Sequence, residues 1–570
     1  MSKEALTPKR VTREYDEGVQ FNSSEQVNLY NKVDANESFF IGDQWRGVQA
    51  NGLPTPVFNF LKRVVLFSVA NVSTDNLKLH ATPLPSSGKR NSQAIETLTD
   101  ILNDQFASIF EFNKMGSLIR EFARNAAVDG DGCTYTYWDP SVDTGQAAKG
   151  AIKTEVLQNT QVLFGNPNSR DVQSQPYILV ERRMMVDDAR DRAEENDVPQ
   201  DDMNLIESDE KNTSTENGLD RLGGHKVTVL TRLWRDKKTR TIHGYECTKE
   251  VTIRDEWDLG IKLYPITWMN WDYVQESYHG QAMITGLIPN QIFVNKLFAM
   301  SMISLMTLAY PKIVYDHTKL AHWNNRVGAA IPVNGNVDNV AKIIDPAQIS
   351  PQISQFIETA VSYTQKFLGA TDVALGDTRP DNTSAIIALQ RAASTPMELT
   401  KQNLLQSIED QGRIYTEFMG EYYGTRYVEI KNPYDSEKLV IAFDFSVLKT
   451  LPFTINLDVG ASSYWSEIAS MQTLDNLLMQ GKIDTVDYLE RIPAGQITDK
   501  ETLIAVMKQR QMQQAQMMGM GGTPDNGGTP ASPGGEVAEN SGAGSPLPAG
   551  AGYSQLQRKI NQTGAVPSKM

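Results

Sequence analysis

Residues 281–310 read QAMITGLIPNQIFVNKLFAMSMISLMTLAY, an apolar segment rich in methionine and asparagine. The spacing of its large apolar side chains predicts a helix over Gln281–Leu308. Pro289 either kinks this helix or marks its true start, because proline fits the first turn of a helix but disrupts a helix interior. Tyr310–Pro311 should end the helix, since the residue before a proline is pushed out of the helical region.

A compact insert and a second helix are expected next. Residues 312–348 contain short strand-like segments, which predict a small α/β insert. Ser350–Pro351 then predicts a helix start, because serine caps free backbone N–H groups and proline fits the first helical position. This second helix should run to Phe367. The strand-like segments of the insert are residues 313–315, 330–333 and 340–344.

A loop and a long helix complete this central stretch. Residues 370–382 are rich in glycine, proline and aspartate, a composition that predicts a mobile, solvated loop. Apolar side chains then recur at helical spacing from about Ser384 to Gly424. Pro396 lies inside this predicted helix and should kink it, because proline removes one backbone hydrogen bond and clashes with the preceding turn.

The segments on either side of this stretch alternate between helical and strand-like patterns, which predicts an α+β fold. Residues 199–224 are polar and acidic and predict a loop or a disordered insertion. Residues 519–570 hold few large apolar side chains, so we expect them to be disordered. Helices are expected at 23–40, 54–71, 92–128, 187–196, 464–479, 485–489 and 499–518. Strands are expected at 77–83, 133–138, 151–157, 177–184, 226–234, 239–247, 250–253, 427–430, 439–445 and 453–457.

The composition is that of a large, acidic, globular protein. The 570 residues, with 40% hydrophobic residues and a mean hydropathy of −0.39, suggest several domains with ample polar surface. The net charge of −15 argues against an ordinary DNA-binding domain, because tight binding to phosphates needs a basic surface. Two cysteines, Cys133 and Cys247, cannot build a disulfide framework and are expected to be reduced and structural.

Neither a membrane span nor a signal peptide is expected. The longest uninterrupted apolar run, Leu297–Tyr310, is shorter than the roughly 20 residues that a spanning helix needs. Residues 1–18 are charged and lack an apolar centre. Four polar or charged residues interrupt the segment before the apolar run: Asn290, Gln291, Asn295 and Lys296.

The sequence holds no common catalytic motif, such as a phosphate-binding G-x-x-x-x-G-K-[ST] loop, H-E-x-x-H or G-x-S-x-G. Its six histidines are scattered, and the spacing of His317 and His322 is poor for two ligands of one metal on a helix. We expect the acidic clusters within 187–210 to be solvated faces and Cys133 to be core. Two aromatic groups are expected to be packing anchors: Phe39, Phe40 and Trp45, and Trp268, Trp271 and Tyr273.

Short motifs between Val27 and Tyr423 follow one another in a characteristic order. They are Phe39–Trp45 (FFIGDQW), Pro54–Thr55–Pro56 with Asn59, Arg124–Gly132 (RNAAVDGDG), Phe164–Asn168 (FGNPN), Tyr264–Ile266, Tyr278–Gly280, Ile288–Gln291 and Asn295–Lys296. In this order they resemble the motifs of bacteriophage portal proteins. The charged insertion at 199–224 and the polar C-terminal residues lie outside the resemblance.

The resemblance implies a portal-type fold whose subunits form a closed ring, usually of about twelve copies, at one capsid vertex. The implied parts are an α/β wing at 1–279, which includes the acidic insertion 199–224; a first stem helix at 280–309; a clip at 310–349; a second stem helix at 350–369; a tunnel loop at 370–383; a long kinked helix with C-terminal wing strands at 384–463; a crown-like helical region at 464–518; and a disordered tail at 519–570.

The resemblance also implies roles for individual residues. Lys296 and Lys366 become candidates for the lining of a DNA channel, and Pro396 for the kink of the long helix. The tunnel loop would carry Asp372, Gly376, Asp377, Arg379, Pro380 and Asp381. The clip would present Lys312, Tyr315, Lys319, Trp323 and Arg326 to docking partners.

The implied partners are those of a packaging vertex. They are the terminase large subunit, then head–tail adaptor, neck or tail proteins, together with the major capsid and scaffolding proteins. Double-stranded DNA would pass through the ring without sequence recognition, and neither a cofactor nor an enzymatic activity is expected. The protein would reside in the virion, and in the host cytoplasm during assembly. Two alternatives stay open: another virion structural protein, such as a head–tail adaptor or capsid subunit, and a DNA-processing enzyme.

Overall fold

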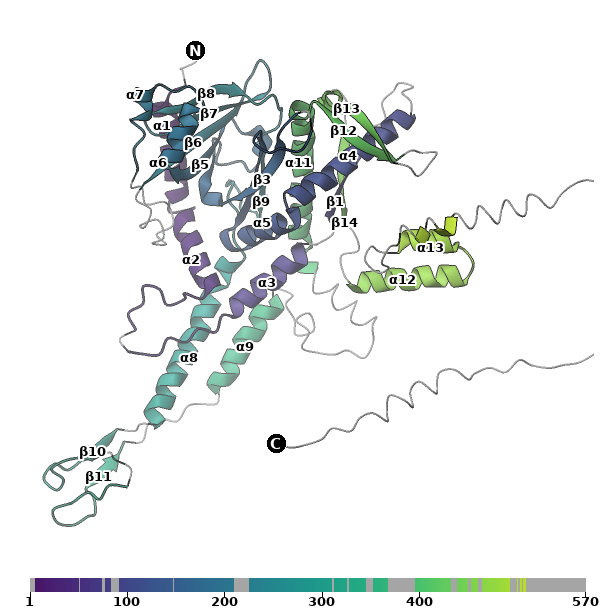
Figure 1. Cartoon of the computed structure of the whole chain (residues 1–570). Coiled ribbons are helices and arrows are strands. Elements are labelled where there is room, and N and C mark those ends of the chain that lie inside the picture. Colours follow the sequence, from purple (N-terminus) through teal and green to yellow (C-terminus); the bar gives the residue numbers. More distant parts are fainter. Residues whose placement is uncertain are drawn as a thin grey trace, which may run out of the picture. The chain divides into compact units, whose positions relative to one another are not determined.

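The computed structural model describes residues 6–50, 52–73, 77–83, 92–146, 148–209, 225–309, 312–324, 326, 328–344, 352–367, 395–431, 438–449, 453–459, 464–492, 500, 503–504 and 506–508. The chain divides into two compact units, Met1–Met471 and Gln472–Met570. Helices and strands both contribute to the first unit, which agrees with the predicted α+β class (Figure 1). The predicted tunnel loop 370–383 and the tail 519–570 lie outside the described residues.

Three helices open the chain: α1 (Pro8–Ser23), α2 (Leu29–Ile41) and α3 (Phe60–Val72). The prediction of a single helix from Ser23 to Phe40 was wrong, because one helix ends at Ser23 and the next begins after Asn28. Asn28 has a left-handed backbone with φ of 44°, which interrupts helical geometry. Helix α1 was not predicted, although its Val11 and Tyr15 are buried.

The predicted helix 92–128 is two helices, α4 (Ser92–Phe112) and α5 (Met115–Asp129). Lys114 separates them with a left-handed φ of 52°, a conformation that interrupts the run of helical hydrogen bonds. Helix α5 ends as predicted at Gly130, whose φ of 102° a residue with a side chain would rarely adopt. The chain therefore leaves α5 directly into a strand.

That strand is the centre of a three-stranded sheet with the order β3-β2-β9. It contains β2 (Asp131–Asp139), β3 (Ala151–Leu157) and β9 (Ile266–Asn270), and both strand pairs are antiparallel. Strand β9 was not predicted. Helix α5 contacts β2, and the later helix α11 contacts β9, so helices from distant parts of the chain cover this sheet.

A five-stranded antiparallel sheet is the second layered part of the first unit. Alternating side chains of β6 face opposite sides, which is the normal geometry of a strand. Leu230 packs in a core cluster with Tyr15 of α1, whereas Val227 and Val229 pack in another with Ala189 of α6. Helices therefore cover both faces. The strands, in sheet order, are β4 (Val162–Phe164), β5 (Ile178–Met185), β6 (Lys226–Arg235), β7 (Ile242–Cys247) and β8 (Thr252–Asp258), and the helix is α6 (Val186–Glu194).

The start of the acidic insertion is ordered and packed, contrary to the prediction of a loop or disordered insertion for the whole of 199–224. Helix α7 (Gln200–Met203) lies there, and Met203 and Ile206 are buried against α6. Arg183 forms an ion pair with Asp209 at 2.9 Å. Residues 210–224 lie outside the described residues.

The central apolar segment forms helix α8 (Ile288–Ala309). Gln281–Leu287 does not belong to it, because Gln281 bridges to Asp272 and Ile284–Gly286 forms a short 3₁₀ turn, η4. Pro289 therefore marks the helix start, one of the two alternatives considered. The strand pair β10 (Ile313–Tyr315) and β11 (Ala341–Ile343) follows, and then helix α9 (Gln352–Phe367). Residues 330–333, predicted as a strand, are irregular.

Helix α11 (Glu398–Tyr422) is the long helix of the first unit. Pro396 does not lie inside it but in the 3₁₀ turn η5 (Thr395–Met397) that precedes it, so Pro396 does not kink the described helix. A Cβ atom on Gly412 would lie 2.8 Å from Ile455, so the missing side chain lets α11 approach strand β14 closely.

The C-terminal strands complete the first unit. Strand β12 (Thr425–Lys431) pairs with β13 (Lys438–Asp444), and β14 (Phe453–Val459) pairs antiparallel with β1 (Leu77–Pro83) from near the chain start. Helix α12 (Tyr464–Met479) reaches into the second unit. The second unit also contains α13 (Thr485–Arg491), whose Tyr488 donates a 2.5 Å hydrogen bond to Asp475.

Candidate functional site

Helix α8 exposes an apolar surface that the rest of the described chain does not cover. Only 11% of its most apolar 18-residue window is buried. Its exposed side chains include Met300, at 58% exposure, and Leu305, at 55%. Figure 1 shows α8 and α9 side by side, with β10 and β11 beyond the far end of α8. Such a surface on one chain marks a place where another molecule packs.

The beginning of α8 is anchored by buried amide side chains. Gln291 donates a 2.7 Å hydrogen bond to the carbonyl of Phe58, and Asn295 donates a 2.6 Å hydrogen bond to Oε1 of Gln44. The two amides also bond each other at 3.0 Å. The ring of Phe58 stacks on Phe298 at 3.9 Å between centroids. Motifs from residues 39–45, 54–59 and 288–296 thus meet at one place.

Helix α8 is long and apolar enough to cross a membrane by length and composition alone. The length of this segment does not exclude a membrane span, contrary to the prediction from sequence, because at 1.5 Å per residue the 22 residues of α8 span ~33 Å. The buried hydrogen bonds at the start of α8 count against a membrane span. The buried amides Gln291 and Asn295 lie within α8 and bond Phe58 and Gln44, so the first turns of the helix belong to the folded body.

The two lysines predicted to line a channel lie one on each of these paired helices. Lys296 is exposed on α8, immediately after Asn295 of the anchor. Lys366 belongs to α9, and its side chain lies outside the described part. The helices are joined by a 3.1 Å hydrogen bond from Asn290 to Thr364.

The predicted docking residues lie in the insert that carries β10 and β11. The rings of Tyr315 and Trp323 lie 5.8 Å apart, and both side chains remain partly exposed. Lys312 and Arg326 are exposed, while Lys319 lies 4.0 Å from Asp316. Among the described residues of the insert, Leu320 is the one buried apolar side chain. The insert therefore presents its aromatic and basic side chains outward.

A buried polar network lies next to the turn that leads into α8, with the carboxylate of Asp131 at its centre. Asn270 and the backbone N–H of Gly280 each donate a 2.7 Å hydrogen bond to Oδ1. Nδ1 of His279 lies 2.7 Å from Oδ2, and Asn159 donates to the same atom at 3.2 Å. The motifs at 124–132 and 278–280, far apart in sequence, are therefore in direct contact.

An ion pair ties α2 to α5 near this network. Both terminal nitrogens of Arg124 bond the carboxylate of Glu37, at 2.5 and 2.6 Å, and the guanidinium lies over the ring of Phe40. Burial raises the pKa of Asp129 well above its usual value, and the neighbouring Glu37 adds to this shift. The sequence did not predict the contacts of Asp131, His279 and Arg124. What singled these residues out in the sequence was their place in the ordered motifs at 124–132 and 278–280.

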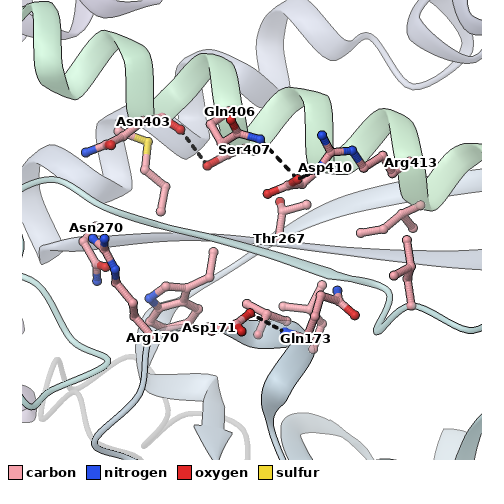
Figure 2. Close-up of a pocket in the computed structure, with 16 residues that line it drawn as sticks. Arg170, Asp171, Gln173, Thr267, Asn270, Asn403, Gln406, Ser407, Asp410 and Arg413 are labelled. Atoms are coloured by element: carbon pink, nitrogen blue, oxygen red, sulfur yellow. Dashed lines mark hydrogen bonds and ion pairs between the residues drawn. The ribbon is translucent and has the colours of Figure 1, made fainter. Parts of the chain in front are cut away.

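A cavity of about 460 Å³ lies beside α11 (Figure 2). Asn403, Gln406, Ser407, Asp410 and Arg413 of α11 line one side, opposite Arg170, Asp171 and Gln173. Ser407 donates to the carbonyl of Asn403, and Asp410 accepts a 2.7 Å hydrogen bond from Arg413. Burial raises the pKa of Asp410, although Arg413 opposes the shift. Its polar groups bond one another along α11, and none of the predicted site residues lies here.

A family model describes most of this chain. The phage P22-like portal protein family matches residues 19–444, which cover the wing, α8, α9, the insert and α11. The chain belongs to this family of bacteriophage portal proteins. No curated protein matches the sequence.

Membership of the portal family makes the chain a structural component of a phage capsid rather than a member of an enzyme family. The match includes every motif of the ordered series and ends close to the end of β13. The aromatic anchors Phe40 and Trp271 are buried as predicted, whereas Tyr273 is exposed beneath the guanidinium of Arg170. Cys133 and Cys247 are buried free thiols, also as predicted.

Some predicted site residues are not placed by the structure. The tunnel-loop residues Asp372, Gly376, Asp377, Arg379, Pro380 and Asp381 lie outside the described residues. The structure brings Lys296 close to the anchor and Tyr315 close to Trp323, and these two groups lie at separate places along the α8–insert segment.

Proposed function

We propose that this chain forms a closed ring of about twelve subunits whose central opening conducts double-stranded DNA. The observation that carries the proposal is the exposed apolar surface of α8 in a portal-family chain. In a ring, α8 and α9 of each copy would pack against those of its neighbours. The contact would be heterologous, as every interface of a cyclic ring is.

Burial between neighbours would explain why α8 is so apolar. Each large side chain moved from water into an interface contributes roughly 1.5–3 kcal/mol, so several on one helix favour assembly strongly. Phe356 and Tyr363 of α9 are exposed as well and extend the same kind of surface. We therefore assign residues 280–309 and 350–369 as the paired stem helices of the ring.

The charge of the chain suits a channel that lets DNA slide. About twelve copies at −15 each would carry roughly −180 formal charges, and this repels a polyanion over long range. Lys296 and Lys366 would offset the repulsion locally. The tunnel loop, 370–383, would surround the DNA, with its aspartates limiting adhesion and Arg379 offering a transient phosphate contact.

The insert at 310–349 would be the docking site for the terminase motor and later for adaptor, neck or tail proteins. A two-stranded sheet with a single buried apolar residue has little stability of its own, so contact with a partner would support it. Lys312, Tyr315, Lys319, Trp323 and Arg326 are the residues proposed to make that contact. The wing, 1–279 with the strands of 384–463, would face capsid and scaffolding proteins, and 464–518 would form the crown.

Electron microscopy of the purified full-length chain tests the ring directly. We expect rings with a central opening and a mass near twelve times 63.4 kDa. A folded protein that stays monomeric at micromolar concentration would contradict the proposal.

Shortening the loop tests the channel separately from the ring. Replacement of residues 372–381 by a brief Gly-Ser link should leave ring assembly intact and reduce the DNA content of particles. Wild-type DNA content and infectivity would make the loop a simple connector.

A further inference from the structure

Arg426, the second residue of β12, is a buried cation without a carboxylate partner among the described residues. Its side chain and backbone together are only 7% exposed. The guanidinium lies 3.8 Å from the ring centroid of Tyr423 and 5.6 Å from that of Trp138. Contact with aromatic faces compensates part of the lost hydration of an arginine, but it does not neutralise the charge.

The hydrogen bonds of Arg426 engage only one of its three nitrogens. Nη2 donates to the carbonyl of Gly150 at 2.8 Å and to that of Ala148 at 3.3 Å. Nε is buried without an acceptor in the described part of the chain. Gly150 has a φ of 116°, and a Cβ atom there would lie 2.3 Å from Trp138. Glycine at this position therefore lets Trp138 approach the backbone whose carbonyls accept from Nη2, and Nε keeps a donor that no described residue uses.

The carboxylates nearest in sequence already have partners. Asp139 accepts a 2.5 Å hydrogen bond from Lys153, and Asp143 lies 3.9 Å from Lys149. Burial lowers the pKa of Arg426, and the only group that opposes this shift is Tyr423. Nothing that the structure describes therefore supplies the negative charge that a buried guanidinium usually has beside it.

A cavity of about 200 Å³ adjoins Arg426, between α4, the segment after β2 and the start of β12. Its polar lining comes from Gln105 and Ser108 of α4, from Thr144 and Gln146, and from Tyr427. Among the described residues, no acidic side chain and no second basic side chain lines it. The cavity thus offers one positive charge surrounded by neutral hydrogen-bonding groups.

We infer that Arg426 and this cavity form a binding site for a single carboxylate. One buried positive charge matches one negative charge, and a guanidinium binds the planar carboxylate group well. The neutral hydroxyl and amide groups supply further donors without adding charge. The bound carboxylate would connect α4 to β12, two elements that already contact each other.

Two sources can supply this carboxylate: a small organic acid in solution, or an acidic side chain of a second copy of the chain. The sequence has 69 aspartates and glutamates, so acidic side chains are plentiful on any neighbouring copy. The first source needs no assembly. The second rests on the proposed ring, and the experiments below separate the two.

In the first experiment, acetate is titrated into the full-length protein and binding is measured by calorimetry. The ionic strength is held constant, and chloride is the reference anion. We expect saturable binding that falls about tenfold or more in Arg426→Gln, since hydrogen bonds to charged groups are strong. Arg426→Lys should retain part of it. Gln105→Met removes one neutral donor from a surface helix without touching the arginine, and should weaken binding while leaving folding unchanged.

The second arm measures oligomer size by sedimentation velocity. If a neighbour supplies the carboxylate, Arg426→Gln weakens assembly and wild-type protein shows no acetate binding until it is dissociated. Arg413→Gln is the matched control, because Arg413 lies outside this cavity and pairs with Asp410. If acetate binding is absent from dissociated protein and assembly is the same in Arg426→Gln as in wild type, the inference is wrong. Absence of rings in wild type would overturn the ring alone, because the acetate arm does not need them.

Discussion

Four groups from three segments of the chain, around Asn159, Asn270 and His279–Gly280, bond the carboxylate of Asp131, which is completely buried. An asparagine in its place offers one acceptor oxygen instead of two, so at least one buried donor would be left without a partner. Each unsatisfied buried group costs about 1–3 kcal/mol, and loss of the buried charge adds to this.

We therefore predict that Asp131→Asn lowers the free energy of unfolding by about 3 kcal/mol or more. Scanning calorimetry of the purified protein would show this as a lower Tm. Asp143→Asn is the matched control, because the Asp143 side chain is 70% exposed and should shift stability by less than about 0.5 kcal/mol. Equal Tm values for both variants would mean that the network contributes little.

The buried carboxyl group of Glu246 should make the stability of the protein depend on pH. Burial raises the pKa of its carboxyl above the usual 4.5, although Arg192, Arg182 and Arg254 oppose the shift. Neither carboxylate oxygen has a well-aligned hydrogen bond, even though Arg192 lies 3.2 Å away. The folded state thus holds the proton more tightly than the unfolded state does, so the stability contributed by this group falls as pH rises from 4.5 through the raised pKa.

Glu246→Gln removes this titration. We expect its Tm to exceed that of wild type above the raised pKa and the difference to shrink as the pH is lowered toward 4.5. Thermal unfolding across this pH range, with exposed Glu195→Gln as the control, is the measurement. A difference that is constant with pH would rule out titration as its origin.

At the scale of elements, local patterns predicted most helices and strands but not their interruptions. Residues 92–128 kept helical spacing throughout, yet the helix breaks at Lys114, and the left-handed position itself holds a lysine, with Gly116 two residues later inside α5. Strand β9 was missed because it is short and is defined by its pairing with β2, more than 130 residues earlier. Pairing between distant segments leaves no trace in a local window.

The break at Lys114 can be tested through its left-handed backbone. Because glycine adopts φ of 52° without steric penalty, Lys114→Gly should raise the free energy of unfolding by up to about 1 kcal/mol. Ala107→Gly, at an exposed position in the interior of the preceding helix, should lower it by about as much, since glycine weakens a helix interior. Thermal unfolding of both variants would show shifts of opposite sign, and a destabilised Lys114→Gly would place the break elsewhere.

In the candidate site, too, the sequence predicted the local features but not the contacts between distant residues. The apolar segment, its proline start and the aromatic and basic residues of the insert were all visible in sequence. The anchor of Gln291 and Asn295 was not, because those amides were interpreted as interruptions of an apolar run and as members of the ordered motifs, with no partner assigned to either. Their partners, Gln44 and Phe58, lie more than 200 residues away.

For the whole molecule, the proposed ring predicts that surface apolar residues of α8 matter for assembly and not for the fold of one chain. Met300→Gln with Leu305→Gln should leave Tm unchanged in the dissociated protein, since both side chains are exposed. Each substitution removes about 2 kcal/mol of stabilisation that burial of the apolar side chain in the interface would supply. Sedimentation should therefore show far weaker assembly.

The matched control for this pair is Met479→Gln, a change of the same kind at an 85% exposed position of α12. That variant should assemble like wild type. Rings of the double variant at unchanged concentration would mean that α8 is not the principal contact between copies.

The pairing of β1 with β14 means that the ribosome makes β1 long before it makes the partner strand. Leu77 lies opposite Val459, so the edge of β1 has no partner until more than 370 further residues have been made. At 5–20 residues per second the synthesis of these residues takes roughly 20–80 s, and β1 remains unpaired during that time. Open strand edges recruit other strands, so nascent or truncated chains that stop before residue 453 carry an aggregation site that the finished chain closes.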